Sequence, residues 1–495
     1  MMNYQISRLI NFGLQKGLIE TDDVEYSVNM LLDVLQLDSF EFFKIEEELA
    51  TAVPILEEML EYSVNKGIIN NSVTEKDLFD TRIMNCIMPR PNEVVNNFTS
   101  LYEKEGANSA TDYFYNLSIA SNYIRKTRTD KNIFFTYDSD YGEIEITINI
   151  SKPEKDPKEI LKSKNIVSTG YPKCALCKEN VGFKGDFNRA ARQTHRIIPI
   201  KLDNEEYYLQ YSPYVYYNEH CIVLNKEHIP MKIDIETISK LFSFVEQFPH
   251  YMIGSNADLP VVGGSILSHD HFQGGRYIFP IENAKIMYSV KLEKYPSTSV
   301  ELLKWPLSTI RLSSDKKKEV LELSEKILEK WKNYSNIDLN IINKTDEVRH
   351  NTITPIVRYE NGKYIIYLTL RNNRTSEDYP FGIFHPHESL HHIKKENIGL
   401  IEVMGLAILP ARLKTELELL GKCLLGQEDI NKHESLEKHY DWYKDLKNKD
   451  FNENNVKEFI EEETAKIFVK ALDDCGVFKL DETGSKAFIE FVESI

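Results

Sequence analysis

The segment Val261–Gly275 reads VVGGSILSHDHFQGG. If residues 269–273 are extended, alternate side chains lie on the same side of the strand, so His269, His271 and Gln273 share one face. Glycine pairs stand on both sides of this stretch. Because glycine has no side chain, a phosphate or a sugar can approach the backbone closely there. The segment therefore predicts a strand that lines a ligand site.

The side chains on this face suit the transfer of a phosphorus group. Histidine has a free base that is plentiful at neutral pH, so it can attack phosphorus without a strong activating base. An amide such as Gln273 can hold a phosphate oxygen while charge shifts during the attack. The alternative is that the two histidines are a structural metal pair or buried polar groups. The His-x-His-x-Gln spacing between glycine pairs favours the functional interpretation.

The surrounding sequence predicts an α+β fold. In the N-terminal part, apolar residues recur three and four positions apart, as in Val53–Ile69, which is typical of amphipathic helices. The alternation in Glu143–Ile150 predicts a half-buried strand, and Thr352–Arg358 with Tyr364–Arg371 predicts a pair of strands. A strand is also expected at Tyr277–Phe279. We expect a long helix from about residue 396, and therefore antiparallel sheets in the middle of the chain with helices at both ends.

These patterns divide the chain into four expected parts. Residues 1–130 form a helical N-terminal extension. Residues 131–290 form a first half that contains a Cys-x-x-Cys pair and the His-x-His-x-Gln segment. Residues 291–425 form a second half, and residues 426–495 form a charged helical tail.

Composition limits the partners. The chain has 495 residues, and its 60 Lys and Arg against 77 Asp and Glu give a net charge of −17. A strongly acidic chain does not bind nucleic acid by general electrostatics, so an anionic substrate needs a locally positive site. The N-terminus has no basic region followed by an apolar run. The apolar stretch Ile398–Leu413 is interrupted by Glu402 and Pro410 and is too short to span a bilayer. We expect a cytoplasmic protein without a membrane partner.

Cys174 and Cys177 are the one closely spaced cysteine pair in the sequence. Two thiolates at this spacing can bind one Zn²⁺ ion, and His228 and His269 are candidates for the remaining ligands. A redox dithiol and a chance pair are the alternatives.

Longer stretches resemble galactose-1-phosphate uridylyltransferases of the histidine-triad superfamily, and specifically their longer bacterial class. The resemblance spans roughly residues 80 to 415. The stretches that carry it are Asn85–Pro91, Cys174–Cys177, Asn225–His228, Gly263–Gln273, Phe384–His387 and His392–Gly405.

The resemblance implies two histidine-triad-like antiparallel sheet halves with flanking helices. It also implies a ping-pong reaction. His271 attacks the α-phosphorus of UDP-glucose and glucose 1-phosphate leaves; galactose 1-phosphate then takes the uridylyl group and leaves as UDP-galactose. Gln273 matches the glutamine that holds phosphate. A phosphorylase or hydrolase with the same nucleophile, using phosphate or water as acceptor, is the alternative, and a zinc-stabilised nucleotide-binding protein with a dead site is the non-enzymatic one. A homodimer is expected.

The resemblance also carries metal ligands. It implies a structural zinc held by Cys174, Cys177, His228 and His269. It further implies a second structural metal, iron or zinc, and the matching positions are Glu282, His350, His385 and His387. Exposed or hydrogen-bonded histidines are an equally weighted alternative for this second set. No organic cofactor is expected.

Basic and polar side chains near the motifs are candidates to bind the diphosphate. Most Lys and Arg side chains are simply solvated, so each assignment competes with that alternative. The candidates are Arg276, Arg192, Ser265, Ser268 and, for the nucleotide, Asn180. The shorter class has proline between the two histidines, whereas this chain has Asp270. Strand alternation places Asp270 on the opposite face from His271.

Overall fold

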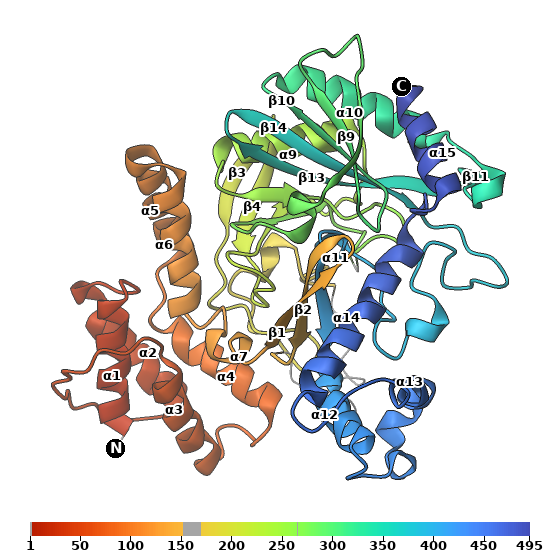
Figure 1. The fold of residues 1–495 in the computed structure, drawn as a ribbon. Helices are drawn as coiled ribbons and strands as arrows, with labels where there is room; N and C mark the ends of the chain where they lie inside the picture. Colours follow the sequence, from red (N-terminus) through yellow and green to blue (C-terminus); the bar gives the residue numbers. More distant parts are fainter. Residues whose placement is uncertain (1, 152–169, 265) are drawn as a thin grey trace. The chain divides into compact units, whose positions relative to one another are not determined.

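Figure 1 shows the computed structural model, which describes residues 2–151, 170–264 and 266–495. The described chain divides into two compact units. Within the described residues, the first comprises residues 2–131 and 170–229, and the second comprises residues 132–151, 230–264 and 266–495.

Helices make up the N-terminal part of the first unit (Figure 1). They are α1 (Met2–Gln15), α2 (Val24–Leu35), α3 (Val53–Asn65), α4 (Val73–Asn85), α5 (Pro91–Glu105), α6 (Ala107–Ala120) and α7 (Lys126–Thr129). Their apolar faces meet one another, and Ile6 and Leu9 of α1, Leu31 of α2 and Ile55 of α3 are fully buried. The predicted helical extension is thus stabilised by burial of one face of each of the helices α1 to α6, as amphipathic helices require, whereas α7 has no buried residue.

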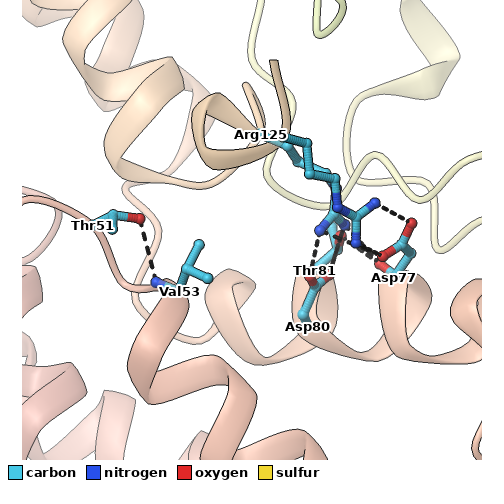
Figure 2. A network of polar contacts seen from close by, with 7 residues as sticks. Thr51, Val53, Asp77, Asp80, Thr81 and Arg125 are labelled. Atoms are coloured by element: carbon cyan, nitrogen blue, oxygen red, sulfur yellow. Dashed lines mark hydrogen bonds and ion pairs between the residues drawn. The ribbon is translucent and has the colours of Figure 1, made fainter. Parts of the chain in front are cut away.

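An ion-pair network joins α7 to α4. Arg125 donates to both carboxylate oxygens of Asp80, at 2.5 and 2.8 Å, and Arg128 binds both oxygens of Asp77 at 2.5 and 2.8 Å. Figure 2 shows Arg125 also reaching Thr81. Burial acts to lower the pKa of Arg125. The attraction of Asp80 and Asp77 together outweighs burial, so the pKa of Arg125 is raised. Bidentate contacts between arginine and a carboxylate fix the relative orientation of the two side chains and also pair their charges.

A three-stranded antiparallel meander completes the first unit. It contains β3 (Ile198–Leu202), β4 (Glu205–Tyr211) and β5 (Cys221–Asn225), paired in that order. The hydroxyl of Tyr211, at the end of β4, donates to the carbonyl of Thr111 in α6 at 3.1 Å. This bond links the meander to the helical part.

The second unit contains a small mixed sheet. The strands β1 (Ile133–Ser139) and β2 (Gly142–Asn149) form an antiparallel hairpin, and β15 (Leu406–Pro410) lies parallel to β2. Ile144, Ile146 and Ile148 of β2 are buried, as the alternating sequence predicts. Helix α14 (Val456–Cys475) packs against the hairpin (Figure 1).

A larger antiparallel sheet carries the His-x-His-x-Gln strand. Its strands in the second unit run in the order β7 (His271–Gly275), β6 (Met252–Gly254), β13 (Asn351–Glu360), β14 (Lys363–Asn372), β10 (Thr309–Ser314), β9 (Ser299–Leu303) and β8 (Ile286–Val290). Asn361 and Gly362 both have positive φ and make the tight turn between β13 and β14. Helices α9 (Ile235–Gln247) and α10 (Lys317–Lys332) pack on this sheet.

The remaining helices of the second unit are α11 (Leu400–Val403), α12 (Arg412–Leu424), α13 (Tyr440–Leu446) and α15 (Glu482–Glu493). The α+β class with antiparallel sheets is confirmed. No helix in the described parts of the chain is long and apolar enough to cross a membrane.

Two local expectations are wrong. The long helix from about residue 396 is only the single turn of α11, because Gly405 has φ +98° and the chain then enters β15. A β-carbon at Gly405 would meet Trp305 at 2.8 Å, so this turn is tightly packed. Tyr277–Phe279 is not a strand: β7 ends at Gly275, and a 3₁₀ helix starts at Pro280.

Candidate active site

Strand β7 starts at His271 and is the first strand in the sheet order of the second unit. It pairs with β6, where Gly254 lies opposite Gln273. His269 and His271 are both buried, and Gln273 is half-buried. His271 and Gln273 are two residues apart in one strand and therefore point to the same face.

One hydrogen bond orients the His271 ring. Its Nδ1 lies 2.7 Å from the carbonyl oxygen of His269. A carbonyl can only accept, so Nδ1 must carry the hydrogen, and in the neutral ring the lone pair then lies on Nε2. Burial lowers the pKa of His271, and this outweighs the opposite effects of the His269 carbonyl and of Asp270. In the neutral ring, Nε2 is thus the nitrogen that carries the lone pair.

The glycines before the strand have different roles. A β-carbon on Gly263 would lie 2.4 Å from the carbonyl oxygen of Ala257 and 2.7 Å from that of Leu259. Gly263 pairs here with Ala257 in an isolated parallel β-bridge, which leaves no room for a side chain. The sequence assigned this glycine to ligand approach, but its closest neighbours are main-chain atoms of the same unit.

Asn256 is a positioning residue that the sequence did not single out. Its side chain is buried, and its Oδ1 accepts from the N–H of Leu400 at 2.9 Å. A β-carbon on Gly264 would lie 2.8 Å from its Nδ2. Asn256 therefore ties the start of α11 to the stretch that precedes the histidines. An isolated Asn without a motif around it gave no signal in the sequence.

In the first unit, Cys174, Cys177 and His228 lie together. The two sulfur atoms are 3.6 Å apart, and Cys177 Sγ is 3.2 Å from His228 Nδ1. In tetrahedral zinc sites, Zn–S bonds of about 2.3 Å put two sulfurs about 3.8 Å apart. Asn180 donates to the carbonyls of Cys174 and Cys177 at 2.9 and 2.8 Å and so holds the loop.

The chemistry of these donors fits a metal. Burial raises the pKa of Cys174 to about 11, so without a cation nearby this side chain is a neutral thiol. A bound cation reverses this, because thiolates are the form that ligates. Cys174, Cys177 and His228 of the first unit are therefore donors that could hold a metal ion, and His269 stays the predicted fourth ligand.

Known families resemble the chain over most of its length. The profile of the family "Galactose-1-phosphate uridyl transferase, N-terminal domain" matches residues 17–230, and that of the C-terminal domain matches residues 244–444. The chain belongs to the galactose-1-phosphate uridyl transferase family. This confirms the resemblance seen in the sequence.

Relatives with the name galactose-1-phosphate uridylyltransferase share this length. The protein of Clostridium acetobutylicum is 53% identical over 495 residues, covering 99% of both chains. That of Caldanaerobacter subterraneus is 53% identical over 505 residues, covering 99% of this chain and 97% of its own. The crystal structure of yeast Ap4A phosphorylase Apa2 aligns with a TM-score of 0.33 and 11% identity, covering 78% of this chain and 94% of that one, and carries no argument at that score.

The residues that the sequence predicts to bind the diphosphate of the transferase substrate differ in their exposure and contacts. Ser265 lies outside the described residues, and Ser268 is exposed. Arg276 is half-buried. Arg192 donates to the hydroxyl of Tyr123 at 2.9 Å. Their roles in ligand binding stay predictions.

Two members of the predicted second metal set have protein partners of their own. Glu282 forms an ion pair with Arg358 at 2.5 Å. Its pKa is raised because burial outweighs the attraction of Arg358. His350 contacts Asn373 through Nδ1 and Thr345 through Nε2, both at 2.9 Å.

The other two members, His385 and His387, also contact side chains of the protein. His385 Nε2 lies 3.2 Å from Asn397 Oδ1, and His387 Nδ1 lies 3.3 Å from Asp474 Oδ1. Across the described residues, these two histidines do not join Glu282 or His350 in a group of metal ligands. The second metal stays a prediction.

Proposed function

We propose that the protein transfers UMP from UDP-glucose to galactose 1-phosphate, giving UDP-galactose and glucose 1-phosphate, through a uridylyl group held on His271. Membership of the family and the names of relatives over the full length support the reaction. The observation that carries the mechanism is the bond from His271 Nδ1 to the His269 carbonyl, because it leaves Nε2 as the nucleophile.

In the first half-reaction, Nε2 of His271 attacks the α-phosphorus. An N–P bond forms as the P–O bond to glucose 1-phosphate breaks, and the leaving oxygen takes the electron pair. The ring becomes cationic because a neutral imidazole has donated its lone pair. The hydrogen bond from Nδ1 to the carbonyl of His269 strengthens as this charge develops, which stabilises the transition state more than the ground state.

In the second half-reaction, a phosphate oxygen of galactose 1-phosphate attacks the same phosphorus and Nε2 leaves as a neutral base. Both leaving groups are sugar phosphates, so the transfer runs in either direction. We assign to the Gln273 amide the holding of a non-bridging oxygen in both steps, since it lies on the strand face of His271. Ser265, Ser268, Arg276 and Arg192 are our candidates for the diphosphate. Asn180 holds the cysteine loop through its hydrogen bonds, and we propose that it also contacts the nucleotide.

A zinc ion bound by Cys174, Cys177, His228 and His269 would supply structural support and no chemistry. The residue types are those of structural zinc sites, and His269 would be fixed as a ligand while its carbonyl orients His271. We further infer a cytoplasmic homodimer built from two similar halves, residues 131–290 and 291–425, with helical parts before and after. The resemblance of the sequence to the family supports this organisation.

The test follows the uridylyl group. The full-length protein is incubated with UDP-glucose labelled in the uracil, without acceptor, and protein-bound label is measured. We expect label that is stable to base, lost in acid and discharged by galactose 1-phosphate. His271→Ala should abolish it, whereas His433→Ala, a histidine in the C-terminal tail, should leave it unchanged. Discharge by phosphate or water alone would identify a phosphorylase or hydrolase, and absence of label would refute the covalent mechanism.

A further inference from the structure

A cavity of about 350 Å³ lies inside the first unit, against the helical extension. Its walls come from stretches far apart in the sequence. Leu18 and Tyr26 belong to the N-terminal helical region, Met88 and Arg90 to the link between α4 and α5, and Arg196 to the segment before β3. None of these residues has a role in the proposed transfer, whose nucleophile belongs to the other unit.

The size of the cavity sets the size of an occupant. Pockets for small molecules span about 300–1,000 Å³, so this one suits a single compact molecule. Polar and apolar groups share the lining: Leu18, Met88 and Pro89 provide apolar surface, and Asn85 and Gln193 provide amides. Such a mixture suits a sugar ring, which has apolar C–H faces and a rim of hydroxyls.

Arg196 is a buried cation in this wall without an anionic partner. Its side chain is 6% exposed, and its four hydrogen bonds go to main-chain carbonyls: Nε and Nη2 to Pro89, and Nη1 to Gln193 and His195. A guanidinium has five N–H groups, so one has no acceptor among the described residues. No described carboxylate forms an ion pair with it. Buried charges are normally paired, because an unpaired one is costly.

Arg90 adds a second positive charge. It is the N-cap of α5, a 15-residue helix whose N-terminal dipole is also positive, and its Nη2 donates to the hydroxyl of Tyr26 at 3.3 Å. The pKa of Arg196 is lowered to about 10, chiefly by burial and also by repulsion from Arg90. An anion between the two guanidiniums would relieve this repulsion.

Two carboxylates also line the cavity. Asp23 accepts from the N–H of Glu20 through Oδ2, and Glu93 lies in the first turn of α5; both are exposed. Glu93 partly offsets the lowered pKa of Arg196 but forms no ion pair with it in the described structure. Carboxylates accept hydrogen bonds from hydroxyl groups, so the wall offers partners to both ends of a phosphorylated sugar.

We propose that this cavity is a binding site for a phosphorylated monosaccharide, with the phosphate between Arg90 and Arg196 and the hydroxyls toward Asp23 and Glu93. The buried guanidinium and the second arginine bind the phosphate in charge-assisted hydrogen bonds, and the apolar wall covers the C–H face of the ring. The helical extension thus has a ligand of its own, separate from the uridylyl chemistry.

The test uses glucose 6-phosphate as the probe, because its phosphate is not on the anomeric carbon that the proposed transfer uses. Isothermal titration of the full-length protein should give one site per chain, with glucose and inorganic phosphate binding at least tenfold more weakly. Arg90→Gln should weaken binding by about tenfold or more, and Asn85→Trp, which fills the cavity from its rim, should abolish it. Arg82→Gln is the matched control: an exposed arginine of α4 that does not line the cavity.

Both cavity variants change exposed side chains, so they should keep the native circular dichroism spectrum and melting temperature. Binding that is lost in His271→Ala would place the ligand at the uridylyl site and overturn the proposal. So would binding that Arg90→Gln and Asn85→Trp leave unchanged, equal affinity for inorganic phosphate, or no binding of glucose 6-phosphate. Because His271→Ala abolishes the transfer but should leave this site intact, failure of one proposal is distinguishable from failure of the other.

Discussion

Glu416 in α12 contacts three basic side chains, of which Lys438 and His439 belong to the C-terminal tail and Arg412 to α12 itself. Its carboxylate accepts from Arg412 and Lys438 at 2.6 Å each and contacts His439 Nε2 at 3.0 Å. Burial acts to raise the pKa of Glu416, but the bonds from His439, Lys438 and Arg412 outweigh it and lower the pKa from 4.5 to about 2. The Glu416→Gln variant keeps the shape and removes the charge.

The magnitude follows from the shift. At about 1.4 kcal/mol per pKa unit, the full shift corresponds to roughly 3 kcal/mol. Arg412 and Lys438 are 29% and 39% exposed, and solvent screens their share. We therefore expect Glu416→Gln to weaken the attachment of the tail by about 2 kcal/mol at pH 7. Hydrogen exchange of amides in α13, which follows the contact, should speed up by about thirtyfold if these amides exchange through detachment of the tail.

The pH dependence gives a second check. The pKa of Glu416 is lower in the folded chain than in the unfolded chain, so its stabilisation is fully present above about pH 4.5 and is lost as pH falls toward 2. The difference between wild type and Glu416→Gln should therefore shrink below pH 4.5. Glu418→Gln, an exposed neighbour on α12, should change neither quantity. Equal exchange at pH 7, or a difference that grows as pH falls, would refute the reasoning.

Two further changes test other parts of the fold. Cys177→Ser should reduce bound zinc, measured by elemental analysis, from about one per chain to a small fraction, since a serine hydroxyl is a poor zinc ligand; Cys423→Ser is the control, and zinc-free wild-type protein would contradict the assignment. A second equivalent of metal would support the Glu282 set. Asp80→Asn leaves the Arg125 guanidinium short of its anion and should lower the free energy of unfolding of the first unit by about 3 kcal/mol. Urea unfolding should detect this, with Asp22→Asn as the control; unchanged stability would mean the network is not needed.

Sequence patterns predicted those elements of the fold that depend on residues close together in the chain. The turn at Asn361 and Gly362 identifies the β13–β14 hairpin through its backbone requirement, and the alternation in β2 identifies a strand. The prediction of a long helix from about residue 396 was wrong because a short apolar run is equally compatible with a buried helix and a buried strand. The positive φ at Gly405 decides between them, and a glycine alone does not reveal its φ.

The site was predictable to the level of residue types. The spacing predicted His269 and His271 on one side of a strand, but β7 starts at His271 and His269 lies in a bend before it. Only the contact from Nδ1 of His271 to the His269 carbonyl distinguishes the two rings. The contacts of Glu416, and the cavity that contains Arg196, join residues distant in the sequence. No period or motif encodes such meetings, so they needed the folded chain.

The parallel pairing of β15 with β2 has a consequence for synthesis. The β1–β2 hairpin leaves the ribosome roughly 260 residues before its partner strand exists. At about 5–20 residues per second, the nascent chain carries a row of isoleucines and an unpaired strand edge for on the order of 10–50 seconds. The small sheet of the second unit can be completed only after the whole of the first unit has been synthesised. Strand β15 therefore completes this sheet when most of the chain has already been made.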